Sequence, residues 1–273
     1  MTTARDRTER CIAAIARLDP QLRAFITPTP DMARAQAMRA DAAARPLGPA
    51  HGLIIAVKDC VDIGGVRATA GSRFFKDRIA SVDSTVVARL RASGAILIGT
   101  TNLHEFCYGG TTQNAHWGAC RSPWDIARIP GGSSGGSAVA VASGMAEAAI
   151  GTDTGGSIRG PASINGIAGF RPSFGSVPCT GTFPVSPPLD ISGPMARRVL
   201  DLALIFAAIA GHDPADPFSA TRDPPEVLRS LGAGVAGLRI GVPRNHYFDG
   251  APDDIVARVT VSYTHLRAHE TKA

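Results

Sequence analysis

Residues 52–59, G-L-I-I-A-V-K-D, carry the most informative strand signal in the chain. A short run of aliphatic, partly β-branched residues that begins at a glycine predicts a strand buried on both faces. Similar strands are expected at residues 95–98, 146–151, 167–170 and 237–243. Helical spacing is found at residues 8–18, 31–44, 83–93, 137–144 and 197–210, and the first two helices should end before Pro20 and Pro46. Short buried strands that alternate with helices predict an α/β fold with a mixed, largely parallel sheet covered by helices.

The composition is typical of a globular protein and gives no sign of a nucleic-acid or membrane partner. The 273 residues are 44% hydrophobic, enough for one large domain or two small ones. The formal charge of +5 comes from scattered arginines, with no basic run longer than Arg197-Arg198, so no direct nucleic-acid partner is expected. The apolar stretches are too short or too interrupted by glycine to span a bilayer.

The five cysteines are widely spaced and include no C-x-x-C pair. This spacing argues against a disulfide framework or a zinc site, and for a reducing compartment. The N-terminus is polar and charged, unlike a secretory signal. We therefore expect a cytoplasmic protein with no metal and no cofactor.

Three glycine-rich stretches carry hydroxyl groups that could do chemistry: residues 131–137, G-G-S-S-G-G-S, residues 152–159, T-D-T-G-G-S-I-R, and residues 174–181, F-G-S-V-P-C-T-G. The first contains G-x-S-x-G, but the residues before it, W-D-I-A-R-I-P, do not form the apolar strand that a nucleophile elbow needs. A phosphate-binding loop would need a lysine that is absent. Asp153-Thr154-Gly155 is similar to an aspartic protease motif, but no second copy supplies the partner carboxylate.

Lys58 ends the apolar run of residues 52–57, and two interpretations remain open for it. It could be a strand-end lysine paired with Asp59 or Asp62. It could also be a general base, because desolvation at the end of a buried strand favours the neutral amine, which can take a serine proton in place of histidine.

Several segments together resemble the amidase signature family in order and spacing over roughly residues 5–245. The matching segments are residues 52–59, 83–95 (D-S-T-V-V-A-R-L-R-A-S-G-A), 101–106 (T-N-L-H-E-F), 130–137 (P-G-G-S-S-G-G-S), 151–159 (G-T-D-T-G-G-S-I-R), 166–173 (G-I-A-G-F-R-P-S) and 189–197 (L-D-I-S-G-P-M-A-R). The agreement of independent segments is far more specific than any one of them.

The resemblance implies a Ser-Ser-Lys triad. Ser157 would be the nucleophile that forms an acyl-enzyme, Ser133 the bridging serine and Lys58 the base. The peptide bond Gly132–Ser133 would be cis. The family's oxyanion hole would be built from backbone N–H groups of Thr154, Gly155, Gly156 and Ser157, while Asp153 and Arg159 would serve as scaffold.

The activity implied is hydrolysis of a carboxylic amide C–N bond in a small-molecule substrate. The family also includes the catalytic subunit of the tRNA-dependent amidotransferase, so partner subunits or a homodimer are alternatives, as is a catalytically inactive fragment. The motifs S-I-R-G-P at 157–161 and P-P-L-D at 187–190 depart from the pattern common in that subunit, which makes this alternative less favoured.

The end of the chain departs from the family, whose members run considerably further. We expect residues 1–260 to form a truncated amidase signature domain whose C-terminal part is missing, and residues 261–273 to be a non-native tail. The tail contains His265-x-x-x-His269-Glu270, in which the two histidines would lie one helical turn apart. Without a third ligand in reach, this is only a weak pattern for a metal site.

Overall fold

The computed structural model describes residues 2–234, 237–239, 241–242, 245 and 247–270. The chain divides into two compact units, Met1–Leu228 and Arg229–Ala273. The first unit holds the sheet and the candidate site.

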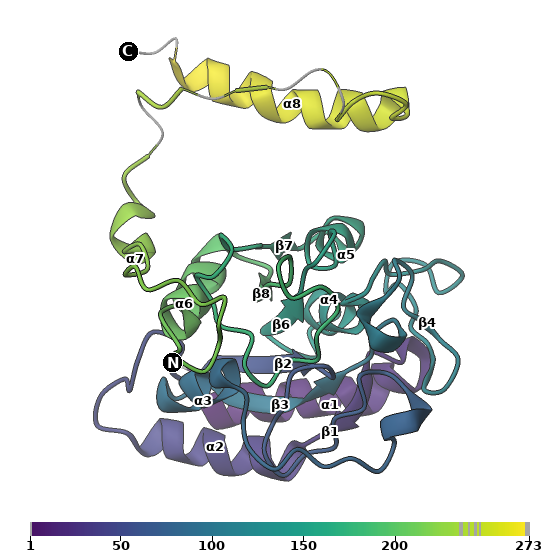
Figure 1. Ribbon diagram of the computed structural model, residues 1–273, viewed down its shortest axis with the longest axis vertical. Helices are drawn as coiled ribbons and strands as arrows, with labels where there is room; N and C mark the ends of the chain where they lie inside the picture. The colour runs from purple at the N-terminus through teal and green to yellow at the C-terminus, as the bar shows by residue number, and fades with distance from the viewer. Residues whose placement is uncertain (1, 235–236, 240, 243–244, 246, 271–273) are drawn as a thin grey trace. The chain divides into compact units, whose positions relative to one another are not determined.

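A six-stranded sheet in the order β1-β3-β2-β6-β8-β7 forms the centre of the first unit (Figure 1). Its strands are β1 (Phe25–Pro28), β2 (Ile54–Lys58), β3 (Ile96–Thr101), β6 (Ala148–Thr152), β7 (Ala168–Gly169) and β8 (Ser192–Ala196). β2 pairs in parallel with both β3 and β6, whereas β1–β3, β6–β8 and β7–β8 are antiparallel. Four strands, β3, β2, β6 and β7, therefore run in one direction, and the predicted mixed, largely parallel sheet is confirmed.

Helices cover both faces of this sheet because β2 is apolar on both sides. Ile54 and Ala56 pack into one core with α1 (Ala4–Leu22), α2 (Pro30–Ala42) and α4 (Gly135–Ala142). Ile55 and Val57 pack into a second core with α3 (Thr85–Ala92) and α6 (Val199–Ile209). The remaining elements of this unit are α5 (Arg159–Asn165), the 3-10 turns η1 (Arg73–Phe75) and η2 (Glu105–Cys107), and the small hairpin of β4 (Gln113–Asn114) and β5 (Gly118–Ala119). The result is a helix–sheet–helix sandwich.

Several element boundaries differ from the sequence-based expectations. α1 continues through Pro20 to Leu22, because a proline in the last turn removes only one amide donor from the helix. β1, β8 and α5 were not predicted. β8 contains Pro194 in an interior strand, a position that strand patterns disfavour, and pairing on both sides with β6 and β7 nevertheless holds it in the sheet.

The second unit contains α8 (Asp253–Glu270), while α7 (Val227–Ser230) lies across the boundary between the units. The fifth strand expected at 237–243 falls partly outside the described residues. The residues that are described there, 237–239 and 241–242, form a turn and irregular backbone rather than a strand. Within the described residues, no helix is long and apolar enough to cross a membrane.

Candidate active site

The site begins where two neighbouring parallel strands end. Lys58 is the last residue of β2 and Thr152 the last residue of β6, so both side chains lie at the same edge of the sheet. Lys58 is completely buried, and its Nζ donates a hydrogen bond of 2.7 Å to Thr152 Oγ1. A strand-end lysine paired with Asp59 or Asp62 is therefore not what the structure contains, because Asp62 binds Arg78 and Asp59 binds Thr69.

Ser133 lies against the same lysine from the loop that precedes α4. Lys58 Nζ donates a second hydrogen bond of 2.7 Å to Ser133 Oγ, and Ser133 is fully buried. The peptide bond Gly132–Ser133 is cis, as the resemblance implied. The next residue, Ser134, donates its hydroxyl to the carbonyl oxygen of Thr152 at 3.2 Å, which fixes this loop to the end of β6.

Ser157 lies in the glycine-rich loop between β6 and α5 and is only partly buried. Its carbonyl oxygen accepts the Ser134 amide at 3.2 Å, which places this loop beside the loop of Ser133. Within the described part of the chain, the Ser157 hydroxyl makes no hydrogen bond, so the structure joins Lys58 to Ser133 directly but not Ser133 to Ser157 through their hydroxyls.

Asp153 holds the glycine-rich loop in shape. Its carboxylate accepts the amides of Gly156 (2.8 Å) and Ile158 (3.1 Å) and forms ion pairs with Arg159 and Arg171. Burial opposes ionisation, but these hydrogen bonds and charges outweigh it and lower the pKa of Asp153. The expected scaffold role of Asp153 and Arg159 fits these contacts.

One part of the expected oxyanion hole differs from this geometry. The Gly156 amide already donates its hydrogen bond to Asp153, so it is not available to an oxyanion. The amides of Thr154, Gly155 and Ser157 have no acceptor among the described residues. Three of the four predicted donors therefore remain free.

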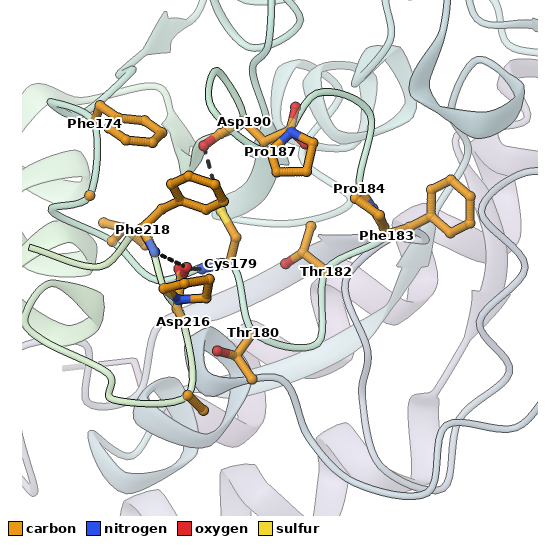
Figure 2. Close-up of a pocket in the computed structure, with 14 residues that line it drawn as sticks. Phe174, Cys179, Thr180, Thr182, Phe183, Pro184, Pro187, Asp190, Asp216 and Phe218 are labelled. Carbon is orange, nitrogen blue, oxygen red and sulfur yellow. Dashed lines mark hydrogen bonds between the residues drawn. The ribbon is translucent and has the colours of Figure 1, made fainter.

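Asp190 also binds this loop, a role that was not predicted from the sequence. Its carboxylate accepts the hydroxyl of Thr154 and the amides of Val185 (2.8 Å) and Ser186 (3.0 Å). Asp190 is also in the wall of a cavity of about 300 Å³ (Figure 2). Apolar side chains, among them Phe174 and Phe218, supply much of that wall.

Two further features near Lys58 were not predicted either. Burial raises the pKa of Asp59 to about 6, although hydrogen bonds from Thr69 and Gly71 oppose this shift. Cys60 and Cys107 are buried in the same core cluster as Val57 of β2, and all five cysteines are free. Thr152 could have been found from the sequence, since it directly follows the apolar run at 146–151. The thiols carried no signal, because their proximity depends on the fold.

Among the residues that the structure describes, no group of three or more His, Cys, Asp or Glu side chains is arranged to hold a metal ion.

Comparison with known proteins supplies the context for this geometry. The chain is 44% identical over 268 residues to a Glutamyl-tRNA(Gln) amidotransferase subunit from Chloroflexus aurantiacus, an alignment that covers 97% of this chain and 55% of that protein. It is similar to the crystal structure of the peptide amidase from Stenotrophomonas maltophilia, with a TM-score of 0.75, 40% identity, and coverage of 81% of this chain and 47% of that one. It is also similar to a bacterial aryl acylamidase of the amidase signature family, with a TM-score of 0.79, 35% identity, and coverage of 86% and 49%.

The chain thus spans about half the length of the curated relatives it matches. The family model for amidases matches residues 6–272, nearly the whole sequence, and includes every segment on which the resemblance was based. The chain belongs to the amidase family.

Proposed function

We propose that this chain carries the catalytic centre of a hydrolase that cleaves a carboxylic amide C–N bond in a small molecule. Ser157 is the nucleophile, Ser133 relays the proton and Lys58 is the base. The observation that supports this most strongly is the 2.7 Å hydrogen bond between Lys58 Nζ and Ser133 Oγ in a fully buried setting.

In the proposed reaction, Ser157 Oγ attacks the amide carbonyl carbon. Its proton passes to Ser133 Oγ, whose own proton passes to the neutral amine of Lys58. The free amides of Thr154, Gly155 and Ser157 are the donors available to the oxyanion. Lys58 then returns a proton through Ser133 to the leaving nitrogen. The C–N bond breaks, the amine leaves, and the acyl group remains on Ser157 as an ester. Water attacks this ester with the same relay, which releases the acid and restores the serine.

The test is labelling by a fluorophosphonate probe together with hydrolysis of small aryl amides in the absence of other proteins. Labelling should be lost in Ser157→Ala. In Lys58→Met it should fall by about 10²–10⁴-fold, the usual worth of general base catalysis. Lys76→Met is the matched control, because Lys76 is an exposed lysine paired with Asp77. Equal labelling of wild type and Ser157→Ala would reject Ser157 as the nucleophile.

A second candidate is a catalytic-type subunit that works only with partner chains, as in a tRNA-dependent amidotransferase. The 44% identity to an amidotransferase relative favours it, and the departures at 157–161 and 187–190 weigh against it. Hydrolysis of aryl amides by the chain alone would support the first candidate. Turnover that requires the other amidotransferase chains would support the second.

A further inference from the structure

The pairing between β6 and β8 continues beyond the ends of both strands into the glycine-rich loop. One step past the last strand pair, the Asp153 amide donates to the carbonyl oxygen of Ile191 at 2.8 Å. At the next step the bond is made by side chains, because the hydroxyl of Thr154 donates to the carboxylate of Asp190. This side-chain bond therefore ties the start of the glycine-rich loop to the segment that leads into β8.

Asp190 is itself held by a turn at residues 185–190. Its Oδ2 accepts the amides of Val185 at 2.8 Å and Ser186 at 3.0 Å, and its own amide donates to the Ser186 carbonyl oxygen at 2.9 Å. Oδ1 is the oxygen that accepts the Thr154 hydroxyl. One side of the carboxylate is thus fixed to the turn, and the other side fixes the loop.

The two residues after Thr154 are glycines with open space beside them. A methyl group on Gly155 or Gly156 would meet no atom of the described residues within 4 Å. Gly156 has a φ of 136°, a conformation that favours glycine. On the far side of these glycines, the Asp153 carboxylate holds the amides of Gly156 and Ile158. On the near side, the Thr154 hydroxyl holds the chain through its bond to the carboxylate.

The segment between these two carboxylates carries the donors that the proposed reaction needs. The amides of Thr154, Gly155 and Ser157 have no acceptor among the described residues. Donors stabilise a developing oxyanion most when they are aimed at it before the reaction begins. The two peptide planes that flank the Cα of Thr154 carry the amides of Thr154 and Gly155. Fixing the Thr154 side chain therefore restricts two of the three free donors.

We propose that Asp190 is a positioning residue for the oxyanion donors and acts through the Thr154 hydroxyl, which extends the proposed function and rests on it for its catalytic meaning. The carboxylate fixes the direction of the Thr154 side chain, and with it the amides of Thr154 and Gly155. The hydroxyl is used in the bond to Asp190, so its part is to hold the backbone. No proton is transferred in this role.

Labelling of Ser157 by a fluorophosphonate, resolved into probe affinity and the rate of the covalent step, tests this role. Thr154→Val removes the hydroxyl, and Asp190→Ala removes its acceptor. Each should slow the covalent step by about tenfold, less than the roughly 10²-fold that loss of a whole oxyanion donor costs. Probe affinity should be unchanged, because the donors act on the transition state. Thr154→Ser, which keeps the hydroxyl, should restore most of the rate.

The double variant shows whether the two residues act through one contact. Thr154→Val/Asp190→Ala should be about tenfold slower than wild type, like each single variant, whereas losses that multiply to about 100-fold would overturn the proposal. Asp216→Ala is the matched control and should keep the wild-type rate. Asp216 lies in the wall of the same cavity and accepts the amides of Cys179 and Phe218 at 2.8 and 2.9 Å (Figure 2). Among the described residues, it makes no bond to the glycine-rich loop.

The order of the loop backbone gives a second readout that does not depend on labelling. In ¹⁵N relaxation measurements, the amides of Thr154, Gly155 and Ser157 should become more mobile in Thr154→Val and Asp190→Ala, but not in Asp216→Ala. If circular dichroism shows that Asp190→Ala is unfolded, Thr154→Val and Thr154→Ser decide. More mobile amides in the variants of a chain that never labels would keep the Asp190–Thr154 tether and reject the hydrolase activity. Wild-type labelling rates in both single variants, or loop amides as rigid as in wild type, would overturn the positioning role.

Discussion

The two halves of the candidate site are built in opposite ways. At the strand ends, Lys58, Ser133 and Thr152 are at most 6% exposed, and the lysine is hydrogen-bonded to both hydroxyls. In the glycine-rich loop, Gly155 is exposed, and the Ser157 hydroxyl has no partner among the described residues. Proton transfer benefits from a dry, fixed path, whereas the acyl-accepting group must be reached by substrate. In the proposed reaction, the closed half would be complete before a substrate arrives, and the free amides of the open half would be the donors left for it.

Glycine-to-alanine substitutions test this difference most directly, because each half contains a glycine that can be replaced. A Cβ at Gly136 would lie 2.4 Å from the Asn102 carbonyl oxygen and 2.5 Å from that of Ala24. Because backbone cannot easily move away, Gly136→Ala should lower the free energy of unfolding by about 3 kcal/mol or more. A Cβ at Gly155 meets nothing within 4 Å, so Gly155→Ala should change stability by less than about 0.5 kcal/mol.

The order of the two variants should be the opposite for activity per folded molecule: Gly155→Ala should lose more activity than Gly136→Ala. The methyl group of Gly155→Ala projects into the open space over the loop, where the substrate carbonyl must approach three free amides. Fluorophosphonate labelling of Ser157 should fall by about 10²-fold, the scale of losing one oxyanion donor. Denaturant unfolding and labelling rates measure the two effects. A Gly155→Ala protein that is as destabilised as Gly136→Ala would show that the loop is not open.

Local sequence pattern could predict the strand ends of the closed half, but not the contacts that shape the open loop. Lys58 and the end of β6 follow from apolar runs, whose strand character depends on local pattern alone. The free amides of Thr154 and Gly155 depend on how Asp153 and Asp190 bind the loop, and those contacts join residues up to 36 positions apart. β8 was missed for a similar reason: Ser192–Ala196 contains a glycine and a proline, and only pairing on both sides makes it a strand.

The closure of the strand ends should also appear in the dependence of stability on pH, through Asp59. The folded protein keeps the Asp59 proton until about pH 6, whereas an unfolded chain releases it near 3.8. The folded state therefore binds more protons between these values, so stability should fall as the pH rises from about 4 to about 6. The shift corresponds to roughly 3 kcal/mol.

Asp59→Asn should remove this part of the pH dependence, and Asp77→Asn, at an exposed aspartate, should not. Urea unfolding at pH 4, 5, 6 and 7 measures the difference between each variant and wild type. If Asp59→Asn and wild type differ by a constant amount over that range, the carboxyl is solvated and the strand ends are not closed.

The smallest expected effect concerns Thr152, which belongs to the closed half but does not lie on the proposed proton path. Its hydroxyl accepts a hydrogen bond from Lys58 Nζ at 2.7 Å, so it aims the amine at Ser133 without exchanging a proton with substrate. Thr152→Val keeps the shape and the β-branch, and the hydrogen bonds between the Thr152 backbone and the Ser134 hydroxyl remain. We expect the rate of Ser157 labelling to fall about tenfold, which corresponds to about 1.4 kcal/mol of lost alignment. Probe affinity should be unchanged, since nothing in the open loop is altered.

Thr152→Ser, which retains the oxygen, should recover most of the rate. A wild-type rate in Thr152→Val would mean that the hydroxyl does not matter and that the lysine is held by Ser133 and its other neighbours alone, and equal losses in the two variants would mean that the shape of the side chain matters as much as its hydroxyl.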